Sequence, residues 1–277
     1  MSSRTYRGRI APTTSGYLHI GHAQTFKTAM ERAREMGGIL VLRIEDIDFE
    51  RCKKKYADAA IEDLKSIGIQ WDEGDDIGGK YAPYTQSLRM DFYAGAFKKL
   101  LESGKIYPCN ASRKEIAALS AKPKKKFDFA EPEKLFPAEL RCACIKEFSP
   151  GDLEKTWRFK VPDGRKIEFF DNARGAQSFT AGEDFGDFVV WRKIGAPSYE
   201  FAVVADDAAM EITEVVRGED LLLSTARQLL IYEALGFAPP QFYHCGLVLD
   251  KNGKKLSKSN MRAATGNPYL IRNRNSI

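Results

Sequence analysis

The N-terminal part of the chain alternates between short apolar runs and segments with helical spacing. Residues 7–11 are expected to form a strand, and a helix from Gly21 should end at the pair Gly37 and Gly38, because glycine adopts positive φ at little cost. The apolar run Ile39–Ile44 follows at once, as is typical of a strand covered on both faces. Strand, helix and strand in this order predict a βαβ unit.

Two further helices and then a change of pattern follow. Apolar residues recur at helical spacing within 57–64 and again within 92–100. Between residues 104 and 186 the chain carries a basic run, several prolines and short β-like pieces at 157–161 and 167–170. This change predicts an inserted and more irregular module.

The alternation of helices and strands returns after the insertion. The runs "FAVVA" at 201–205 and "ITEVV" at 212–216 are expected to be strands, and residues 221–235 a helix that Gly236 ends. "HCGLVL" at 244–249 predicts a last strand before a polar loop. The pattern as a whole favours an α/β fold whose parallel sheet is interrupted by an α+β module.

The amino-acid composition is that of an ordinary globular protein and says little about the class of function. Of 277 residues, 43% are hydrophobic and 29% charged, and a net charge of +5 is compatible with a polyanionic partner without requiring one. Because no apolar run is long enough to span a membrane and the start lacks a secretion signal, we expect a cytoplasmic protein with no membrane partner. The five cysteines favour free thiols or a metal site over a disulfide framework.

The stretch Arg9–Phe26 carries two of the chain's three histidines where a predicted strand passes into a helix. Ligands of open α/β sheets bind at such junctions, and helix N-termini attract anions. The stretch is neither a Walker loop nor a G-x-G-x-x-G fingerprint. His19 and His22 should meet around the first helical turn, where they can donate hydrogen bonds to a triphosphate.

Two short motifs relate this stretch to a known family. "HIGH" at His19–His22, together with "KLSKS" at Lys255–Ser259, resembles the paired signature of class I aminoacyl-tRNA synthetases. The stretches "RIAPTTSGYLHIGHA", "LRIEDID" and "VVRGED" resemble the glutamyl enzymes of that family. The likeness extends over residues 5–260.

The resemblance implies a Rossmann-like catalytic domain. Residues 1–103 would form its first half, 104–186 an inserted module similar to an acceptor-binding domain, and 187–277 its second half with the KMSKS-like loop. Glutamyl-tRNA synthetases carry a helical anticodon-binding region after this loop, whereas this chain ends 18 residues after Ser259. We therefore expect no anticodon-binding domain, as in the similar glutamyl-queuosine tRNA(Asp) synthetases.

Those relatives activate L-glutamate with ATP and attach it to queuosine in the anticodon of tRNA(Asp). The resemblance thus implies an ATP-dependent ligase, with L-glutamate, ATP and queuosine-containing tRNA(Asp) as partners and Mg²⁺ accompanying the ATP. Two alternatives stay open: a glutamyl-tRNA synthetase catalytic core that charges the 3′ end of tRNA(Glu), and a non-catalytic paralogue that binds glutamate or tRNA. The sequence does not decide the tRNA identity or whether activation needs tRNA, and we expect a monomer.

The resemblance assigns six residues to glutamate binding, namely Arg9, Ala11, Thr13, Glu45, Tyr199 and Arg217. A guanidinium offers a bidentate fork to a carboxylate, which suits Arg9 and Arg217. Glu45 ends a buried strand, where an acid needs a partner: the resemblance implies the substrate ammonium, and the alternatives are an ion pair with Arg43 or a helix cap. Arg9 could alternatively be a surface residue, and Tyr199 a core residue.

The same resemblance assigns catalysis to His19, His22 and Lys258, and ATP binding to these three residues and Gly21. Lys258 lies in a polar loop and would reach the β and γ phosphates as a point charge. Asp46 and Asp48 are interpreted as turn or cap residues without a catalytic role.

The insertion departs from the family at its zinc motif. Many members bind zinc through C-x-C followed by a tyrosine and another cysteine, whereas here Ala111 stands where the second cysteine is expected. Cys109, Cys142 and Cys144 form an incomplete ligand set, which Tyr107 could complete. A zinc site and a metal-free remnant both stay open, and no metal ligand is assigned.

Overall fold

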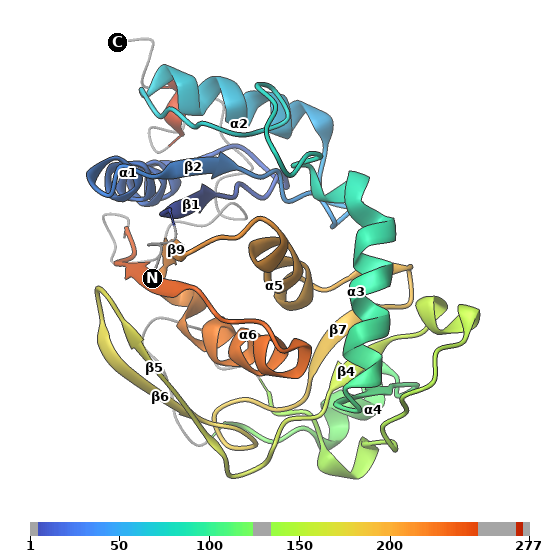
Figure 1. The fold of residues 1–277 in the computed structure, drawn as a ribbon. Helices are drawn as coiled ribbons and strands as arrows, with labels where there is room; N and C mark the ends of the chain where they lie inside the picture. Colours follow the sequence, from blue (N-terminus) through green and yellow to red (C-terminus); the bar gives the residue numbers. More distant parts are fainter. Residues whose placement is uncertain (1–4, 124–133, 249–269, 274–277) are drawn as a thin grey trace. The chain divides into compact units, whose positions relative to one another are not determined.

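The computed structural model describes residues 5–123, 134–248 and 270–273, drawn as coloured ribbon in Figure 1. The chain divides into two compact units. The first comprises Met1–Arg89, Met210–Glu219 and Pro240–Ile277, and the second Met90–Ala209 and Asp220–Pro239. The sequence predicted an inserted module bounded by residues 104 and 186, and these two boundaries remain predictions.

The first unit is built on parallel strands. Its strands are β1 (Arg7–Ile10), β2 (Ile39–Leu42), β9 (Glu214–Gly218) and β10 (Gln241–Cys245). Its helices are α1 (Ile20–Glu35) and α2 (Lys54–Ser66), with the short 3₁₀ turns η1 (Gln86–Arg89) and η6 (Ile271–Asn273). Strand β1 pairs in parallel with β2, and β9 with β10.

Two contacts place β9 beside β1 in the same direction. The backbone N–H of Thr213 donates to the oxygen of Arg7 over 2.9 Å, and two residues further along β1 the Arg9 side chain donates to the Val216 oxygen over 3.0 Å. The carboxyl ends of β2, β1, β9 and β10 therefore lie at one edge. In open α/β sheets this is the edge where ligands bind.

The core of the first unit confirms the predicted βαβ arrangement. Helix α1 buries Phe26, Ala29 and Ala33 in one cluster with apolar residues of β1, β2 and α2. The helix ends just before Gly37, whose φ of +56° is the positive value expected of the glycine pair. Because α1 covers the strands, burying its apolar stripe holds the strand–helix–strand unit together.

The second unit combines helices with antiparallel strands. Its helices are α3 (Met90–Glu102), α4 (Arg113–Leu119), α5 (Tyr199–Ala209) and α6 (Leu222–Leu235), with 3₁₀ turns η2 (Ala138–Leu140) and η3 (Pro150–Glu154). The strands β3 (Ile106–Pro108), β4 (Trp157–Phe159), β7 (Phe188–Arg192) and β8 (Ala196–Pro197) pair antiparallel, and β5 (Lys166–Asp171) forms a hairpin with β6 (Gly175–Thr180). A further turn, η4 (Glu219–Leu221), precedes α6.

The strand expected at "FAVVA" is wrong, because these residues lie in helix α5. Every residue from Glu200 to Asp207 is buried, so the apolar pattern lacks the polar face that identifies a surface helix. The helix begins after Ser198, whose carbonyl oxygen accepts from the Ala202 N–H over 3.0 Å. A short apolar run with two β-branched residues cannot by its pattern be told from a strand.

The last strand also differs from the expected 244–249. Strand β10 begins at Gln241 and ends at Cys245, so only its final two residues fall within the predicted range. The Leu247 N–H donates to Glu219 Oε1 over 3.1 Å rather than to a neighbouring strand, which ends the ladder. In the parts of the chain that the structure describes, no helix is long and apolar enough to cross a membrane.

Candidate active site

The two histidines of the "HIGH" stretch cap the N-terminus of α1. His19 is the N-cap residue, and its Nδ1 accepts from the Gly21 N–H over 3.1 Å. The N–H of His19 in turn donates to Nδ1 of His22 over 3.1 Å, and the two ring centroids are 3.6 Å apart. Each imidazole thus satisfies a backbone donor that a helix end leaves exposed.

This capping determines where the imidazole protons are. A nitrogen that accepts a hydrogen bond carries no proton, so both neutral rings carry their N–H on Nε2. The pair therefore presents two Nε2 donors at the positive end of the α1 dipole, an arrangement that favours a phosphate. Gly21 lies in the same turn. It packs closely on the His19 ring, since a Cβ at this position would lie only 3.0 Å from the ring atom Cε1.

Arg9 lies at the carboxyl end of β1 and is buried, so it is not a surface arginine. Its Nη1 donates to the Val216 oxygen over 3.0 Å, directly beside Arg217 on β9. The chain then passes through Ala11 to the backbone bridge between Thr13 and Glu45. The structure therefore brings four of the six predicted glutamate-binding residues, Arg9, Thr13, Glu45 and Arg217, to one edge, with Ala11 between two of them.

Glu45 forms an ion pair with Arg43, the protein partner that the sequence analysis named as an alternative to the substrate ammonium. Arg43 Nη2 donates to Glu45 Oε1 over 3.0 Å, and both side chains are buried. A carboxylate has two oxygens with about four lone-pair sites, so this ion pair is compatible with a second cationic partner. Asp48 accepts from Arg51 three residues later, as expected of a turn residue, whereas Asp46 accepts from the N–H and hydroxyl of the distant Ser87 in η1.

Arg217 contacts a residue that the sequence did not single out. His244 is its register partner on β10, and Arg217 Nε donates to His244 Nε2 over 3.1 Å. Both side chains are buried, and the His244 ring stacks on Phe242 at a centroid distance of 6.3 Å. The only signal in the sequence is that His244 is the third histidine and lies in a predicted strand.

Two predicted site residues are not brought to this edge by the described contacts. Tyr199 belongs to the second unit, where it is the first residue of α5. Lys258 and the rest of the "KLSKS" stretch lie outside the described residues. Their roles stay predictions.

The three cysteines of the second unit differ in exposure, and Cys144 packs against the cluster that contains Cys109. Cys109 is buried beside Tyr107 and Phe136, whereas Cys142 is exposed, and across residues 5–123, 134–248 and 270–273 no cluster of histidine, cysteine or acidic side chains could hold a metal ion. The Tyr107 hydroxyl donates to Asp187 over 2.6 Å, and burial followed by this contact raises the pKa of the phenol far above its ordinary value. Asp187 therefore engages the hydroxyl that could have completed a zinc ligand set.

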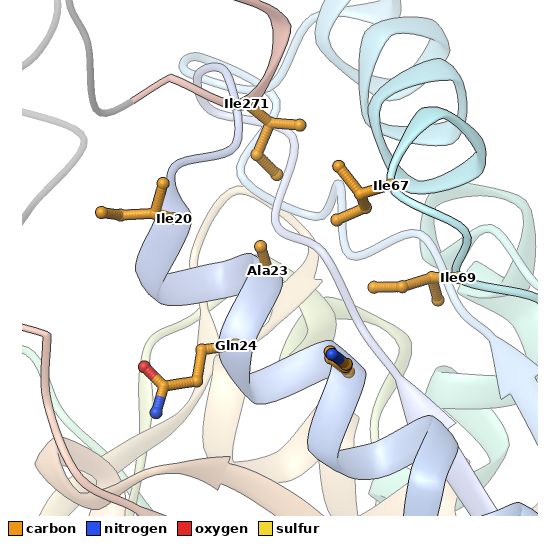
Figure 2. Close-up of a pocket in the computed structure, with 7 residues that line it drawn as sticks. Ile20, Ala23, Gln24, Ile67, Ile69 and Ile271 are labelled. Carbon is orange, nitrogen blue, oxygen red and sulfur yellow. The ribbon is translucent and has the colours of Figure 1, made fainter. Parts of the chain in front are cut away.

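A groove of about 210 Å³ on the first unit begins at Ile20 of the "HIGH" stretch, but none of the predicted site residues lines it (Figure 2). It is lined by side chains of α1, by Ile67 and Ile69 after α2, and by Ile271. Its lining offers one amide, from Gln24, and one ammonium, from Lys27. This groove is therefore unsuited to a triphosphate or a dicarboxylate.

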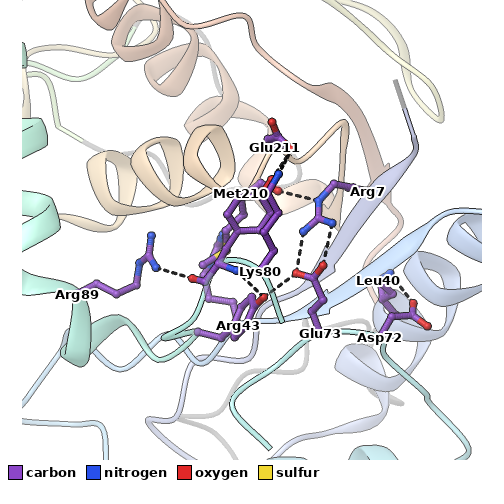
Figure 3. Close-up of polar contacts among 11 residues, drawn as sticks. Arg7, Leu40, Arg43, Asp72, Glu73, Lys80, Arg89, Met210 and Glu211 are labelled. Carbon is purple, nitrogen blue, oxygen red and sulfur yellow. Dashed lines mark hydrogen bonds and ion pairs between the residues drawn. The ribbon is translucent and has the colours of Figure 1, made fainter. Parts of the chain in front are cut away.

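A second set of buried charges lies at the amino end of β1 (Figure 3). Arg7 donates from Nη1 and Nη2 to the two carboxylate oxygens of Glu73 over 3.0 and 2.9 Å, and from Nε to the Met210 oxygen over 2.8 Å. The Tyr84 hydroxyl donates to Glu73 over 2.6 Å. These contacts tie β1 to the segment after α2 and to the residue after α5, all within the first unit.

Comparison with known proteins identifies the family. The family model for the catalytic domain of class I tRNA synthetases of the E and Q type matches residues 5–269. The chain belongs to this family. As a member of the class I E and Q synthetases, it shares their α/β catalytic fold with a parallel sheet, and the family uses ATP.

Individual relatives fall into two groups. The chain is 41% identical to a glutamyl-Q tRNA(Asp) synthetase of Symbiobacterium thermophilum, over 95% of this chain and 83% of the relative. It is 43% identical to a glutamate–tRNA ligase of Syntrophus aciditrophicus, over 93% of this chain but 52% of the relative, so it spans about half that protein's length. Among solved structures, a glutamate tRNA ligase from Elizabethkingia meningosepticum in complex with its amino acid aligns with a TM-score of 0.77 and 31% identity, over 96% of this chain and 54% of that one.

Proposed function

We propose that the chain activates L-glutamate with ATP to glutamyl-adenylate and transfers the glutamyl group to queuosine in the anticodon of tRNA(Asp). The observation that carries the proposal is the edge where Arg9, Glu45 and Arg217 lie together, on the strand system that leads into the histidine-capped N-terminus of α1. Cationic, anionic and phosphate-binding groups there suit an amino acid and a nucleotide.

Glutamate carries two carboxylates and one ammonium. Arg9 and Arg217 each supply a guanidinium for a carboxylate, and Glu45 supplies a carboxylate for the ammonium. Ala11 and Thr13 lie on the loop that follows Arg9 and reaches Glu45. We propose that Tyr199 contributes a further contact to glutamate. Because these side chains are held by backbone and side-chain partners, little conformational freedom is lost when glutamate binds.

In the activation step, a carboxylate oxygen of glutamate attacks the α-phosphorus of ATP and the bond to pyrophosphate breaks. No protein nucleophile is needed, since the protein aligns the reactants and stabilises charge. His19 and His22 donate from Nε2 to phosphate oxygens, and Lys258 stabilises the departing pyrophosphate. Mg²⁺ bound with ATP neutralises phosphate charge.

In the transfer step, a hydroxyl oxygen attacks the adenylate carbonyl and AMP leaves. Similarity over 83% of a glutamyl-Q tRNA(Asp) synthetase supports the queuosine ring as the source of that hydroxyl. The comparable identity to a glutamate–tRNA ligase supports the alternative, a terminal ribose of tRNA(Glu). Either acceptor places the reaction in the cytoplasm, where tRNA and ATP are found.

The experiment that tests the proposal measures transfer of labelled glutamate, with ATP and Mg²⁺, to tRNA(Asp) containing queuosine. The same tRNA without queuosine and a tRNA(Glu) serve as matched acceptors. Label that depends on queuosine is the expected result. Label on tRNA(Glu) instead contradicts the acceptor, and the absence of glutamate-dependent ATP–pyrophosphate exchange with every tRNA contradicts the activation step as well.

A further inference from the structure

The segment 270–272, around the turn η6, lies against the stretch that leads into the histidine cap of α1. Leu270 forms an antiparallel backbone bridge with His19, and the Ile271 N–H donates to the Leu18 oxygen over 3.3 Å. These contacts hold the backbone at the N-cap residue and at the residue before it. The two parts of the chain are far apart in the sequence, so this contact exists only in the folded first unit.

Apolar burial fixes the segment 270–272 in place. Ile271 is 2% exposed and belongs to the same apolar cluster as Phe26 of α1. Figure 2 shows its side chain directed into the groove between α1 and the residues that follow α2. Leu270 is also buried and packs with Tyr17 and Ile20, which lie on either side of Leu18 and His19. The segment is therefore anchored by its side chains as well as by its backbone.

The charged residue of the segment ties it to α2. Arg272 donates from Nε and Nη2 to Asp63 Oδ1 over 3.2 and 3.0 Å, and from Nη2 to the Ala59 oxygen over 3.4 Å. Its guanidinium carbon also lies 4.5 Å from the centroid of the Tyr17 ring. A guanidinium over an aromatic face is attracted by the ring. Arg272 thus joins α2 to the residue two positions before His19.

The burial of Asp63 makes this ion pair specific. Asp63 lies on α2 and is 3% exposed, and a buried carboxylate is costly unless a cation pairs with it. Burial raises the pKa of Asp63, while the hydrogen bonds from Arg272 act in the opposite direction. Because Arg272 supplies the cation, the pair holds the arginine in one position on α2.

We propose that Arg272 is a positioning residue for ATP, which acts through the backbone of Tyr17, Leu18 and His19. The assignment rests on the function proposed above, in which the His19 ring donates to phosphate oxygens, and it names a residue that holds this ring in place. A group that stabilises developing charge must be placed accurately, since a misplacement of about 1 Å can slow a reaction severely. The ion pair with Asp63 fixes that placement from α2.

The test compares Arg272→Ala with Arg272→Lys. Lysine can still pair with Asp63, whereas alanine loses both the ion pair and the contact with Tyr17. Glutamate-dependent ATP–pyrophosphate exchange is measured with queuosine tRNA present throughout, giving kcat and the KM values for ATP and for glutamate. Arg34→Ala is the matched control, because Arg34 also pairs with an aspartate, Asp72, over 2.7 Å but lies in the last turn of α1.

The expected result for Arg272→Ala is a KM for ATP raised about tenfold and a KM for glutamate within about twofold of wild type, because the phosphate-binding end of α1 shifts while the glutamate site does not. The KM for ATP of Arg272→Lys should stay within about threefold of wild type. In an Arg272→Ala background, Asp63→Asn should cause no further rise.

Asp63→Asn decides if Arg272→Ala fails to fold. Asparagine keeps the shape of the side chain but loses the charge that holds Arg272, so the KM for ATP should rise at least about threefold. An unchanged KM for ATP in the folded variants overturns the positioning role and leaves the proposed function intact, whether or not stability falls. An equal rise in both KM values also overturns it, because the effect is then not confined to ATP. No exchange by the wild-type chain overturns the proposed function and this assignment with it.

Discussion

Arg7 and Arg217 are buried arginines on β1 and β9 of the first unit, and they lie at opposite ends of their strands. Arg7 begins β1 and donates to both carboxylate oxygens of Glu73 and to the Met210 oxygen. Arg217 lies near the end of β9 and donates from Nε to the neutral His244. The first guanidinium is paired with a carboxylate, whereas the second lies at the edge where the predicted glutamate-binding residues gather.

The difference in position separates a structural ion pair from an arginine at the edge suited to ligand binding. A carboxylate next to a buried guanidinium compensates its charge and so competes with any incoming anion. The two positions agree with this distinction, because Arg7 lies at the amino end of its strand and Arg217 at the carboxyl end, where ligands of α/β sheets bind. Substitutions at the Arg7–Glu73 pair should change stability, and those at Arg217 should change glutamate binding.

The largest effect is expected for Arg217→Ala. Losing two charge-assisted hydrogen bonds to a carboxylate, worth about 3 kcal/mol together, should lower kcat/KM for glutamate roughly 100-fold. Initial rates of glutamate-dependent exchange measure it, with the surface variant Arg34→Ala as control. An unchanged kcat/KM would remove Arg217 from the glutamate site.

A smaller effect, on stability alone, is expected for Glu73→Gln. The Arg7 and Glu73 side chains are 8% and 12% exposed, so removing the carboxylate charge leaves a buried guanidinium without its counter-charge. The free energy of unfolding should fall by about 3 kcal/mol, while the KM for glutamate of the folded protein is unchanged. Denaturant unfolding and exchange kinetics measure the two quantities. A raised KM with unaltered stability would contradict the distinction between the two arginines.

Tyr84→Phe should have a more modest effect on the same pair. The hydroxyl donates to Glu73 over 2.6 Å and accepts from the Tyr81 N–H over 3.0 Å, and burial followed by the Glu73 contact raises the pKa of Tyr84 to about 12. Removing the Tyr84 hydroxyl should lower the free energy of unfolding by about 1 kcal/mol. If Glu73→Gln is already present, Tyr84→Phe should cost less, because the partner charge is gone.

The smallest effect is the pH dependence of the Arg7–Glu73 pair. Hydrogen bonds from Arg7 lower the pKa of Glu73 below its ordinary value of 4.5. The folded state then binds fewer protons than the unfolded state, so the stabilisation is present above pH 4.5 and is lost as the pH falls through the lower, folded pKa. Melting temperatures of wild type and Glu73→Gln, taken from about pH 6 to about pH 3, should therefore converge on acidification. A constant difference would show that the charge of Glu73 does not stabilise the fold.

The sequence predicted the first unit better than the second for physical reasons. The βαβ unit follows from local signals, since a glycine pair ends the helix and an unbroken apolar run marks a covered strand. Helix α5 was missed because it is buried all around, and burial removes the periodicity that distinguishes a helix from a strand.

The candidate site shows the same limit. Residues within a continuous stretch, such as His19 and His22, could be related to each other from their spacing, and Arg43 could be named as the alternative partner of Glu45. The contact between Arg217 and His244 joins residues 27 positions apart and depends on the register of β9 and β10. Register between strands from separate segments is a property of the assembled sheet, which local spacing does not reveal.

The position of the glutamyl group on the product tests the proposed function most directly. After incubation with glutamate, ATP and Mg²⁺, queuosine tRNA(Asp) would be digested to nucleosides and the glutamyl mass located by mass spectrometry. We expect the mass of glutamate on queuosine and none on the 3′-terminal adenosine. Glutamate on the terminal adenosine, with queuosine unmodified, would contradict the proposal.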